Sequence, residues 1–259
     1  MAHSLSTPRS FLYANPGLAL PDGRARDYLS LIRRRARGEP IAYITGQREF
    51  WSLRLCVTPD VLIPRFETEL LVEAALGVLD AGKPARLADL GSGSGAVALA
   101  IASERSQCEV HGTDISPEAV ALARHNAREL GLGRVRFHSG SWFEPLDGQF
   151  NVVVSNPPYV RQGDPHLQQG DCRFEPQLAL AAGEDGLESI RTIIRQAPQW
   201  LVPGGWLMLE HGHDQGHSVR DLLSRQGFAS VKTRQDLSGI NRVTLGRTLA
   251  RVTADPDDE

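Results

Sequence analysis

The sequence from residue 86 onward alternates short apolar runs with segments of helical periodicity. This pattern predicts strands at 86–90, 109–113, 134–138, 150–155 and 205–210, and helices at 96–105, 116–130, 187–201 and 218–226. Strands joined through helices pair in parallel, because antiparallel neighbours need only a short turn. Two further β-rich segments, 229–234 and 242–245, end the pattern. The sequence therefore predicts an α/β fold with a mostly parallel, doubly wound sheet.

The region before residue 67 has a different character. Segment 27–37 predicts a basic amphipathic helix, which the glycine and proline of 38–40 bring to an end. The run of arginines in this helix could contact nucleic acid, although a solvated helix face is the commoner role of such a run. We expect the chain to divide into a helical region over 1–40, a β-containing linker over 41–66, the main domain over 67–250 and a flexible tail over 251–259.

Charge, cysteine content and hydrophobic patterning restrict the class of protein. The formal net charge is -3, whereas proteins that depend on phosphate contacts usually carry a basic surplus, so we expect no stable nucleic-acid partner. Cys56, Cys108 and Cys172 are far apart and odd in number, which predicts neither a disulfide framework nor a zinc site. No apolar run approaches the roughly 20 residues of a membrane span, and the N-terminus lacks the apolar core of a signal peptide. We therefore expect a cytoplasmic protein without a membrane partner.

A glycine-rich loop, 89–95 (DLGSGSG), follows the first predicted strand and opens the first helix. Glycines there allow a tight turn and a close approach of the backbone to a ligand. The spacing is G-x-G-x-G, which differs from the G-x-G-x-x-G of dinucleotide folds and lacks the lysine of a phosphate loop. Asp114 ends the second strand about twenty residues later, where a carboxylate can accept both ribose hydroxyls. A ribose site without phosphate-binding residues favours S-adenosylmethionine over NAD.

The tetrapeptide Asn156-Pro157-Pro158-Tyr159 directly follows the fourth strand. Two prolines cannot continue a strand, because each fixes φ and removes a backbone donor. The strand must end here, with an amide and an aromatic ring at the sheet edge where α/β folds bind ligands. This arrangement suits a small planar group with its own N–H bonds, and a simple proline-rich turn is the alternative. Trp142, after the third strand, could pack on an adenine face or in the core.

A histidine cluster is the remaining candidate site. His211, His213 and His217 have the H-x-H-x3-H spacing that can bind zinc. They surround Gly212 and Gly216 in a loop after a predicted strand, which leaves the ligand directions unconstrained. We therefore expect a polar loop and no metal. The sequence also lacks the G-x-S-x-G elbow of a hydrolase.

Taken together, these motifs make the chain similar to the HemK/PrmC protein-(glutamine-N5) methyltransferases, which modify translation termination release factors. The resemblance runs from about residue 11 to residue 247. Its matching stretches are GEPIAYITG at 38–46, REFW at 48–51, LIPR at 62–65, ETE at 67–69, the glycine loop, NPPY, DPHL at 164–167, FEP at 174–176 and RVTLG at 242–246. NPPY is shared with DNA-adenine and rRNA-guanine methyltransferases, so segment 41–69 singles out this family.

The resemblance implies a Rossmann-like S-adenosylmethionine-dependent methyltransferase domain, preceded by a small, shortened helical region that docks the release factor. The methionine portion of the cofactor would be held by Gly91, Ser92, Gly93, Ser94 and Gly95. Asp114 would bind the ribose and Trp142 the adenine, with Asn156 also reaching the cofactor. The glutamine of the release factor's Gly-Gly-Gln motif would be held by Asn156, Pro157, Pro158 and Tyr159.

The expected catalytic residues are Asn156, Pro157 and Tyr159. The Asn156 side-chain oxygen and the Pro157 carbonyl could accept the two N–H bonds of the glutamine amide, while Tyr159 stacks on its plane. The nitrogen lone pair would then point at the sulfonium methyl, so that positioning and electrostatics supply the catalysis, without a strong base or a metal. Arg65, Glu67 and Glu69 would lie near the mouth of the site, and the loop at 174–176 would flank it.

Three departures from the family pattern stand out. Ser141 replaces the aspartate that usually precedes the tryptophan, which removes one expected adenine contact. Phe66 replaces a proline of the Pro-Arg-Pro-Glu/Asp-Thr-Glu motif, which affects the angle of that loop. The N-terminal helical region is shorter than the usual bundle, which bears on partner affinity more than on chemistry.

Two alternatives remain open at this stage. The same site could methylate an exocyclic amine of a nucleic-acid base, which would require a flipped or single-stranded base. The chain could also be a noncatalytic module that binds S-adenosylmethionine, although the intact Asn156 argues against it.

Overall fold

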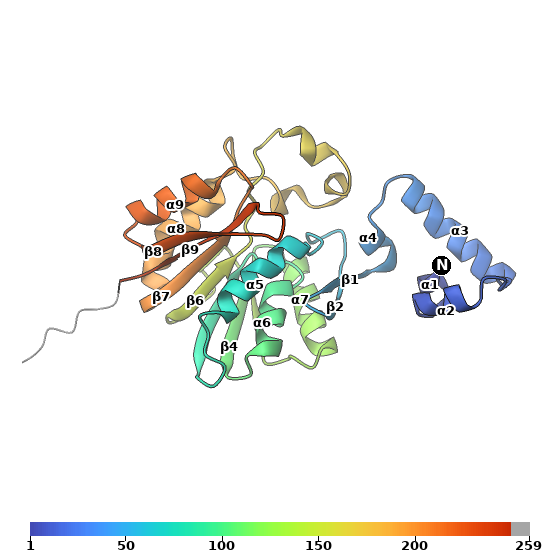
Figure 1. Cartoon of the computed structure of the whole chain (residues 1–259), viewed down its shortest axis with the longest axis horizontal. Coiled ribbons are helices and arrows are strands. Elements are labelled where there is room, and N and C mark those ends of the chain that lie inside the picture. Colours follow the sequence, from blue (N-terminus) through green and yellow to red (C-terminus); the bar gives the residue numbers. More distant parts are fainter. Residues whose placement is uncertain (250–259) are drawn as a thin grey trace, which may run out of the picture.

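The centre of the structure is a seven-stranded sheet with strand order β5-β4-β3-β6-β7-β9-β8 (Figure 1). The computed structural model describes residues 1–249, so the tail expected at 251–259 lies outside the described residues. The strands are β3 (Ala85–Leu90), β4 (Cys108–Asp114), β5 (Arg136–Ser139), β6 (Phe150–Ser155), β7 (Leu201–Glu210), β8 (Ala229–Gln235) and β9 (Asn241–Arg247). Strands β3 to β7 are parallel, whereas β9 is antiparallel to both β7 and β8. The predicted fold class is confirmed.

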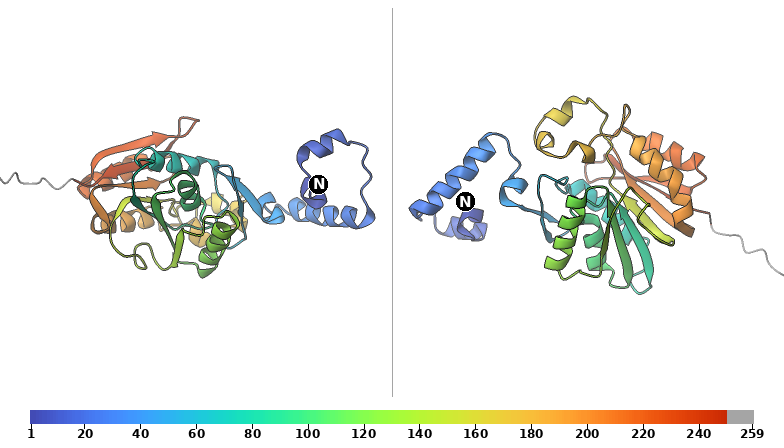
Figure 2. Two further views of the ribbon diagram at one scale, coloured as in Figure 1. Left: turned by 90° about the horizontal axis from the view of Figure 1, so that it is seen from below. Right: turned by 180° about the vertical axis from the view of Figure 1, so that it is seen from behind.

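Helices cover both faces of this sheet (Figures 1 and 2). They are α5 (Glu69–Leu76), α6 (Ala96–Glu104), α7 (Pro117–Glu129), α8 (Glu188–Trp200) and α9 (Gly216–Arg225). Leu87 of β3 packs with Leu71 and Leu99 on one face, while its neighbour Ala88 packs with Ile190 and Val219 on the other. Successive strand residues face opposite sides of a sheet, so two covered faces favour strands with apolar residues on both sides.

The predicted helices of this region are confirmed within two residues at each end. Helix α7 begins as its sequence indicates, with Pro117 in its first turn and the Ser116 hydroxyl accepting a hydrogen bond from the Ala119 amide at 3.1 Å. The strand predicted at 205–210 is too short, because β7 already begins at Leu201. A register irregularity opposite Phe150 allows the strand to continue through its proline and glycines, which otherwise indicate a strand end.

The first 56 residues form four helices and a hairpin, which lie to one side of the sheet (Figure 2). These elements are α1 (Ala2–Leu5), α2 (Arg9–Ala14), α3 (Asp22–Ala36), α4 (Ile41–Thr45), β1 (Gln47–Phe50) and β2 (Leu53–Cys56). The helix predicted at 27–37 begins five residues earlier than expected, directly after Pro21. Segment 41–66 contains the expected strands, but its first five residues are helical.

Short 3₁₀ helices occupy the connections around the sheet edge. They are η1 (Phe66–Thr68), η2 (Pro165–Gln168), η3 (Cys172–Phe174) and η4 (Gln177–Ala179). The last three belong to the long connection between β6 and α8. This connection and η1 approach the carboxyl ends of the parallel strands, where they contribute residues to one cavity.

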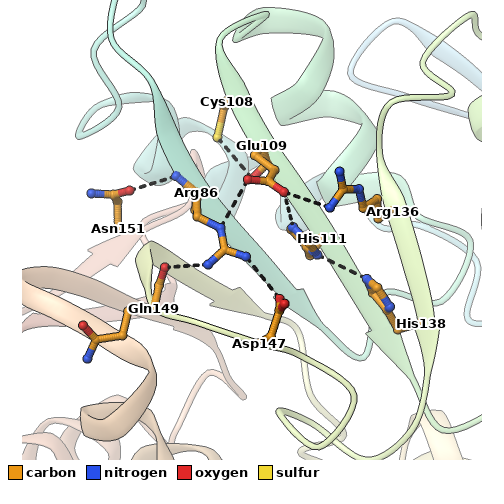
Figure 3. A network of polar contacts seen from close by, with 9 residues as sticks. All are labelled: Arg86, Cys108, Glu109, His111, Arg136, His138, Asp147, Gln149 and Asn151. Atoms are coloured by element: carbon orange, nitrogen blue, oxygen red, sulfur yellow. Dashed lines mark hydrogen bonds and ion pairs between the residues drawn. The ribbon is translucent and has the colours of Figure 1, made fainter.

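A polar network joins the edge strand β5 and its neighbour β4 to β3 (Figure 3). His111 is 2% exposed, and its ring lies between Glu109 Oε1 at 3.0 Å and His138 Nε2 at 3.2 Å. Arg86 of β3 contacts the same Glu109 carboxylate at 3.3 Å. Burial, followed by the nearby His111 and Arg124, lowers the pKa of His138. The neutral imidazole of His138 is therefore the form that fits the folded protein.

This network predicts a pH-dependent contribution to stability. A lowered pKa in the folded state means that His138 stabilises the fold above its ordinary pKa of 6.5, and that this contribution is lost as the pH falls through the lowered value. The free-energy advantage of the wild type over His138→Gln is expected to shrink between pH 7.5 and pH 5, as measured by urea unfolding. The same substitution at the exposed His213 is the control. A pH-independent advantage over His138→Gln would contradict this prediction.

Candidate active site

A cavity of about 580 Å³ opens at the carboxyl ends of β3, β4 and β6. Its wall combines the loop after the β1–β2 hairpin, the glycine loop, the ends of β4 and β5, the turn after β6 and the 176–181 segment. The sequence places these segments far apart, and the parallel sheet brings them to one edge. This is the edge at which open α/β sheets bind ligands.

The glycine loop is fixed to the end of β4 by its backbone. The amides of Gly91 and Ser92 both donate to the Thr113 carbonyl, at 2.8 and 2.9 Å. Gly91 and Gly93 have φ values of 72° and 53°, in the left-handed region that favours glycine. Gly91, Ser92, Gly93 and Ser94 line the cavity, as a loop that cradles a ligand requires.

Gly95 does not line the cavity and faces the other way. A Cβ atom on Gly95 would lie 2.9 Å from the Phe137 ring and 3.2 Å from Ala123. Its φ of 83° also lies in the left-handed region. Two constraints therefore explain why residue 95 is a glycine: the close packing at the start of α6 and the left-handed backbone conformation.

Asp114 faces the cavity from the end of β4. One carboxylate oxygen accepts the Gly93 amide at 2.8 Å and the other accepts the Ser116 amide at 3.0 Å. Burial raises the pKa of Asp114, and these backbone hydrogen bonds lower it again in part. A carboxylate held at both oxygens keeps further lone pairs for the hydroxyls of a ligand.

Asp89 is a cavity residue that the sequence reasoning did not assign. It lies on β3, is 2% exposed, and accepts the Ala98 amide at 3.1 Å. Burial raises its pKa to about 7. The available signal was an acidic residue within the buried end of a strand, two residues before the first glycine of the loop.

Trp142 lines the same cavity with an unusual backbone conformation. Its φ is 47°, which is rare for a bulky residue and requires support from its surroundings. Its ring reaches the glycine loop, since a Cβ on Gly91 would be 3.5 Å from it. Ser141 stands where the family pattern has an aspartate. Its backbone amide donates to Glu144 Oε2 at 3.2 Å, so the carboxylate of Glu144 holds this residue in place.

The turn after β6 divides its four residues between two environments. Asn156 and Pro158 line the cavity, whereas Pro157 and Tyr159 do not. Asn156 Nδ2 donates to the hydroxyl of Thr68 at 3.1 Å, which leaves the side-chain oxygen of Asn156 available. The Tyr159 hydroxyl donates to Glu210 Oε1 at 3.4 Å, and burial followed by the nearby Glu210 raises the pKa of Tyr159.

Two loops near the mouth of the cavity are joined by a buried carboxylate. Glu175 accepts the Ile63 amide at 3.0 Å and forms an ion pair with Arg65, which lines the cavity. Glu175 is 5% exposed. The stretch around Arg65 and the flanking loop at 174–176 are therefore one unit of the wall. Glu67 and Glu69 do not line the cavity, and Glu69 accepts the Trp51 amide at 2.9 Å.

The histidine cluster does not form a site. His211 is buried, with Nε2 2.8 Å from the Thr244 hydroxyl, while His217 pairs with Asp221 on α9. Within residues 1–249, no group of three or more histidine, cysteine or acidic residues has the arrangement of a metal site. No helix in this part of the chain is long and apolar enough to cross a membrane.

Comparisons with known proteins cover nearly the whole chain. A family described as "PrmC N-terminal domain" matches residues 1–46, and one described as "Methyltransferase domain" matches residues 82–237. The release factor glutamine methyltransferase of Vibrio cholerae is 50% identical over 95% of this chain and 87% of its own length. The proteins of that name from Pseudomonas aeruginosa and Xylella fastidiosa are 51% and 49% identical, over 95% of this chain and 90% of theirs.

Solved structures share the fold at low sequence identity. A methyltransferase from Pyrococcus furiosus matches with a TM-score of 0.59 and 18% identity, over 84% of this chain and 98% of its own. The 16S rRNA N2 G1207 methyltransferase of Thermus thermophilus matches with a TM-score of 0.57 and 19% identity, over 78% of this chain and 49% of its own. Both similarities concern the architecture of the sheet domain.

The geometry of the glycine loop predicts that Gly95 contributes to packing, whereas the glycines that line the cavity serve ligand binding. Gly95→Ala is expected to lower the free energy of unfolding by about 1–3 kcal/mol more than Gly131→Ala, because it adds overlap with Phe137 to the same left-handed φ penalty. Gly131 is the matched control, with a φ of 69° and open space where its Cβ would lie. Urea unfolding of both variants measures the difference. Equal losses would show that Gly95 has no packing role.

Proposed function

The chain belongs to the release factor glutamine methyltransferases, and from this premise we propose that it methylates the side-chain amide nitrogen of a release factor glutamine. The methyl donor is S-adenosylmethionine, as in methyltransferase domains of this kind. One observation carries the proposal beyond the family match. Asn156 shares a single cavity with Asp114 and the glycine loop, and its amide nitrogen is already bound to Thr68.

The cavity contains the groups that a nucleoside with an amino-acid tail needs. We assign the ribose to Asp114, the adenine to Trp142 and the methionine portion to the loop from Gly91 to Ser94. Ser92 supports this assignment, because the residue lines the cavity and its buried hydroxyl has no hydrogen-bond partner. Bound S-adenosylmethionine supplies an electrophilic methyl group on its sulfonium. The packing role of Gly95 makes it a support for the loop.

The acceptor amide is a weak nucleophile, because its nitrogen lone pair is delocalised into the carbonyl. In this proposal, the Asn156 side-chain oxygen and the Pro157 carbonyl accept its two N–H bonds. These two acceptors turn the lone pair toward the methyl group and favour a pyramidal nitrogen, so that the rate gain comes from positioning and electrostatics. The proton leaves after methyl transfer, and no strong base is needed before it.

Pro158 and Tyr159 complete the proposed acceptor pocket. Pro158 reaches the cavity wall, and the Tyr159 hydroxyl is turned toward Glu210. Tyr159 does not line the cavity itself, so in this proposal its ring meets the planar amide only where the bound glutamine extends beyond the cavity wall. The turn is stiff, because each proline fixes one φ. A stiff turn suits an acceptor site that works by orientation.

We further propose that the helical region over residues 1–40 docks the release factor, ahead of a linker over 41–66 and a catalytic domain that begins at about residue 67. Helix α3 supports this role, because none of its residues is buried. Its exposed surface combines Leu29 and Ile32 with arginines on the same helix. Such a surface can bind a partner through both apolar and charged contacts.

The substrate assignment predicts transfer to one residue of one protein. Labelled S-adenosylmethionine is expected to methylate a purified release factor, and to leave the same factor unlabelled when the glutamine of its Gly-Gly-Gln motif is changed to alanine. Ribosomal RNA and DNA serve as parallel substrates, since a base amine would fit the same turn. Labelling of nucleic acid alone would overturn the protein assignment.

Substitutions in the cofactor half and in the acceptor half of the site are expected to have different effects. Asp114→Ala is expected to weaken binding of S-adenosylmethionine about tenfold or more, because charge-assisted hydrogen bonds of about 1.5–3 kcal/mol are removed. Asn156→Ala is expected to abolish methyl transfer while changing that affinity little. Calorimetric titration and the transfer assay measure the two effects. Asp147→Ala, at an exposed carboxylate outside the cavity, is the control. Wild-type affinity in Asp114→Ala would remove the ribose assignment.

A further inference from the structure

Glu210 lies behind the proposed acceptor pocket, at the end of β7. It is 1% exposed and does not line the cavity. One carboxyl oxygen accepts the Tyr159 hydroxyl, while the other, Oε2, is buried without a hydrogen-bond partner. An unpartnered carboxyl oxygen in the interior is costly, so its presence calls for an explanation.

Thr68 connects Glu210 to the cavity. It is 4% exposed, ends η1 and lines the cavity, and its hydroxyl oxygen accepts Asn156 Nδ2 at 3.1 Å. A hydroxyl that accepts from Asn156 still has its own proton to donate. Glu210 lies beside Thr68, and this threonine is the strongest influence that lowers the pKa of the Glu210 carboxyl. A hydrogen bond donated by Thr68 to Glu210 would give a partner both to the Thr68 proton and to the unpartnered carboxyl oxygen.

We propose that Glu210, acting through Thr68, fixes which end of the Asn156 amide faces the acceptor substrate. A Thr68 hydroxyl that donates to Glu210 can only accept from Asn156, so the Asn156 nitrogen must face Thr68 and its oxygen must face the cavity. Without an acceptor at Glu210, Thr68 could donate to the Asn156 oxygen instead. The amide would then turn its N–H bonds toward the N–H bonds of the substrate amide.

Glu210 is thus a positioning residue, since it touches neither substrate nor cofactor. This inference rests on the proposed function, in which Asn156 accepts a hydrogen bond from the glutamine amide. It adds a second role for the Tyr159 hydroxyl, which donates to the same carboxylate and holds the aromatic ring in place. One buried carboxylate would then orient both polar side chains of the turn.

The required form of Glu210 is the carboxylate, because a protonated carboxyl can donate to Thr68 and reverse the chain of hydrogen bonds. Burial raises its pKa to about 7, while Thr68, Arg242 and Tyr159 lower it and Glu67 raises it. These groups face Glu210 from η1, β9 and the turn after β6. Activity should therefore rise with pH through about 7 as Glu210 ionises.

Steady-state methylation of a release factor tests this proposal. Glu210→Gln places N–H bonds where the carboxylate accepts, so kcat at pH 8 is expected to fall about tenfold or more. Its affinity for S-adenosylmethionine should stay within about twofold of wild type. The rise of kcat with pH near 7 should become smaller in this variant, and any rise that remains is assigned to Asp89, whose pKa is also about 7. Wild-type kcat, or an unchanged pH profile, in Glu210→Gln would overturn the proposal.

Variants of Thr68 distinguish positioning from a general loss of packing. Thr68→Val is expected to match the loss in Glu210→Gln, the double variant should be no worse than either, and Thr68→Ser should restore activity. Thr244→Val is the matched control, because Thr244 is also buried and hydrogen-bonded but binds His211 instead of Asn156. Fully additive losses for Thr68 and Glu210 would overturn the proposed link.

A spectroscopic test does not depend on the substrate. The chain has five asparagines, so ¹⁵N-asparagine labelling gives a simple side-chain spectrum, in which Asn156→Ala identifies the Asn156 signals. Their shifts and hydrogen exchange are expected to change in both Thr68→Val and Glu210→Gln, and not in Thr244→Val. Unchanged Asn156 signals in Glu210→Gln would overturn the inference. Changed signals without release factor methylation by the wild type would support the positioning while rejecting the proposed function.

Discussion

The Thr113 carbonyl is the contact on which the geometry of the site depends. It accepts the amides of Gly91 and Ser92, and so ties the glycine loop after β3 to the end of β4. Asp114, the next residue, then lies where its carboxylate accepts the Gly93 amide. The carboxylate and the loop are thus set at a fixed separation by two backbone hydrogen bonds to Thr113 and by one from the Gly93 amide to the Asp114 side chain. This arrangement demands positive φ at the loop glycines, which explains the local sequence.

Features that arise from local rules could be predicted from the sequence. The alternation of strands and helices follows from the periodicity of hydrophobic residues along the sequence. The start of α7 follows from Ser116 and Pro117. Asp114 ends β4 and Asn156 directly follows β6, so their convergence on one cavity follows from the parallel topology. The extension of β7 to Leu201 was missed, because it depends on an irregularity in the pairing of β7 with β6, where the extra residues lie in β7. The orientation of Gly95 was missed as well, since it depends on Phe137 from another strand.

The polar groups behind the cavity wall could not be predicted in the same way. Thr68 and Asn156 are 88 residues apart, and Arg65 and Glu175 are 110 residues apart. No spacing rule links such pairs, because their contact depends on how connections outside the sheet fold over its edge. The sequence showed these residues as parts of motifs, but it did not show which partner each one has. Side-chain orientation therefore needed the structure.

The proposed reaction, which needs no strong base, accounts for a costly buried carboxylate in the fold. When the nucleophile is an amide, the rate depends on which way hydrogen-bond acceptors point, and an asparagine presents an acceptor only if its amide is held against rotation. With a pKa of about 7 against an ordinary value of 4.5, ionised Glu210 lowers the stability of the fold by roughly 3 kcal/mol above neutral pH. A neutral residue would avoid that loss but could not accept from Thr68 and Tyr159 together. The instability is thus the physical consequence of fixing a donor–acceptor pattern at Asn156.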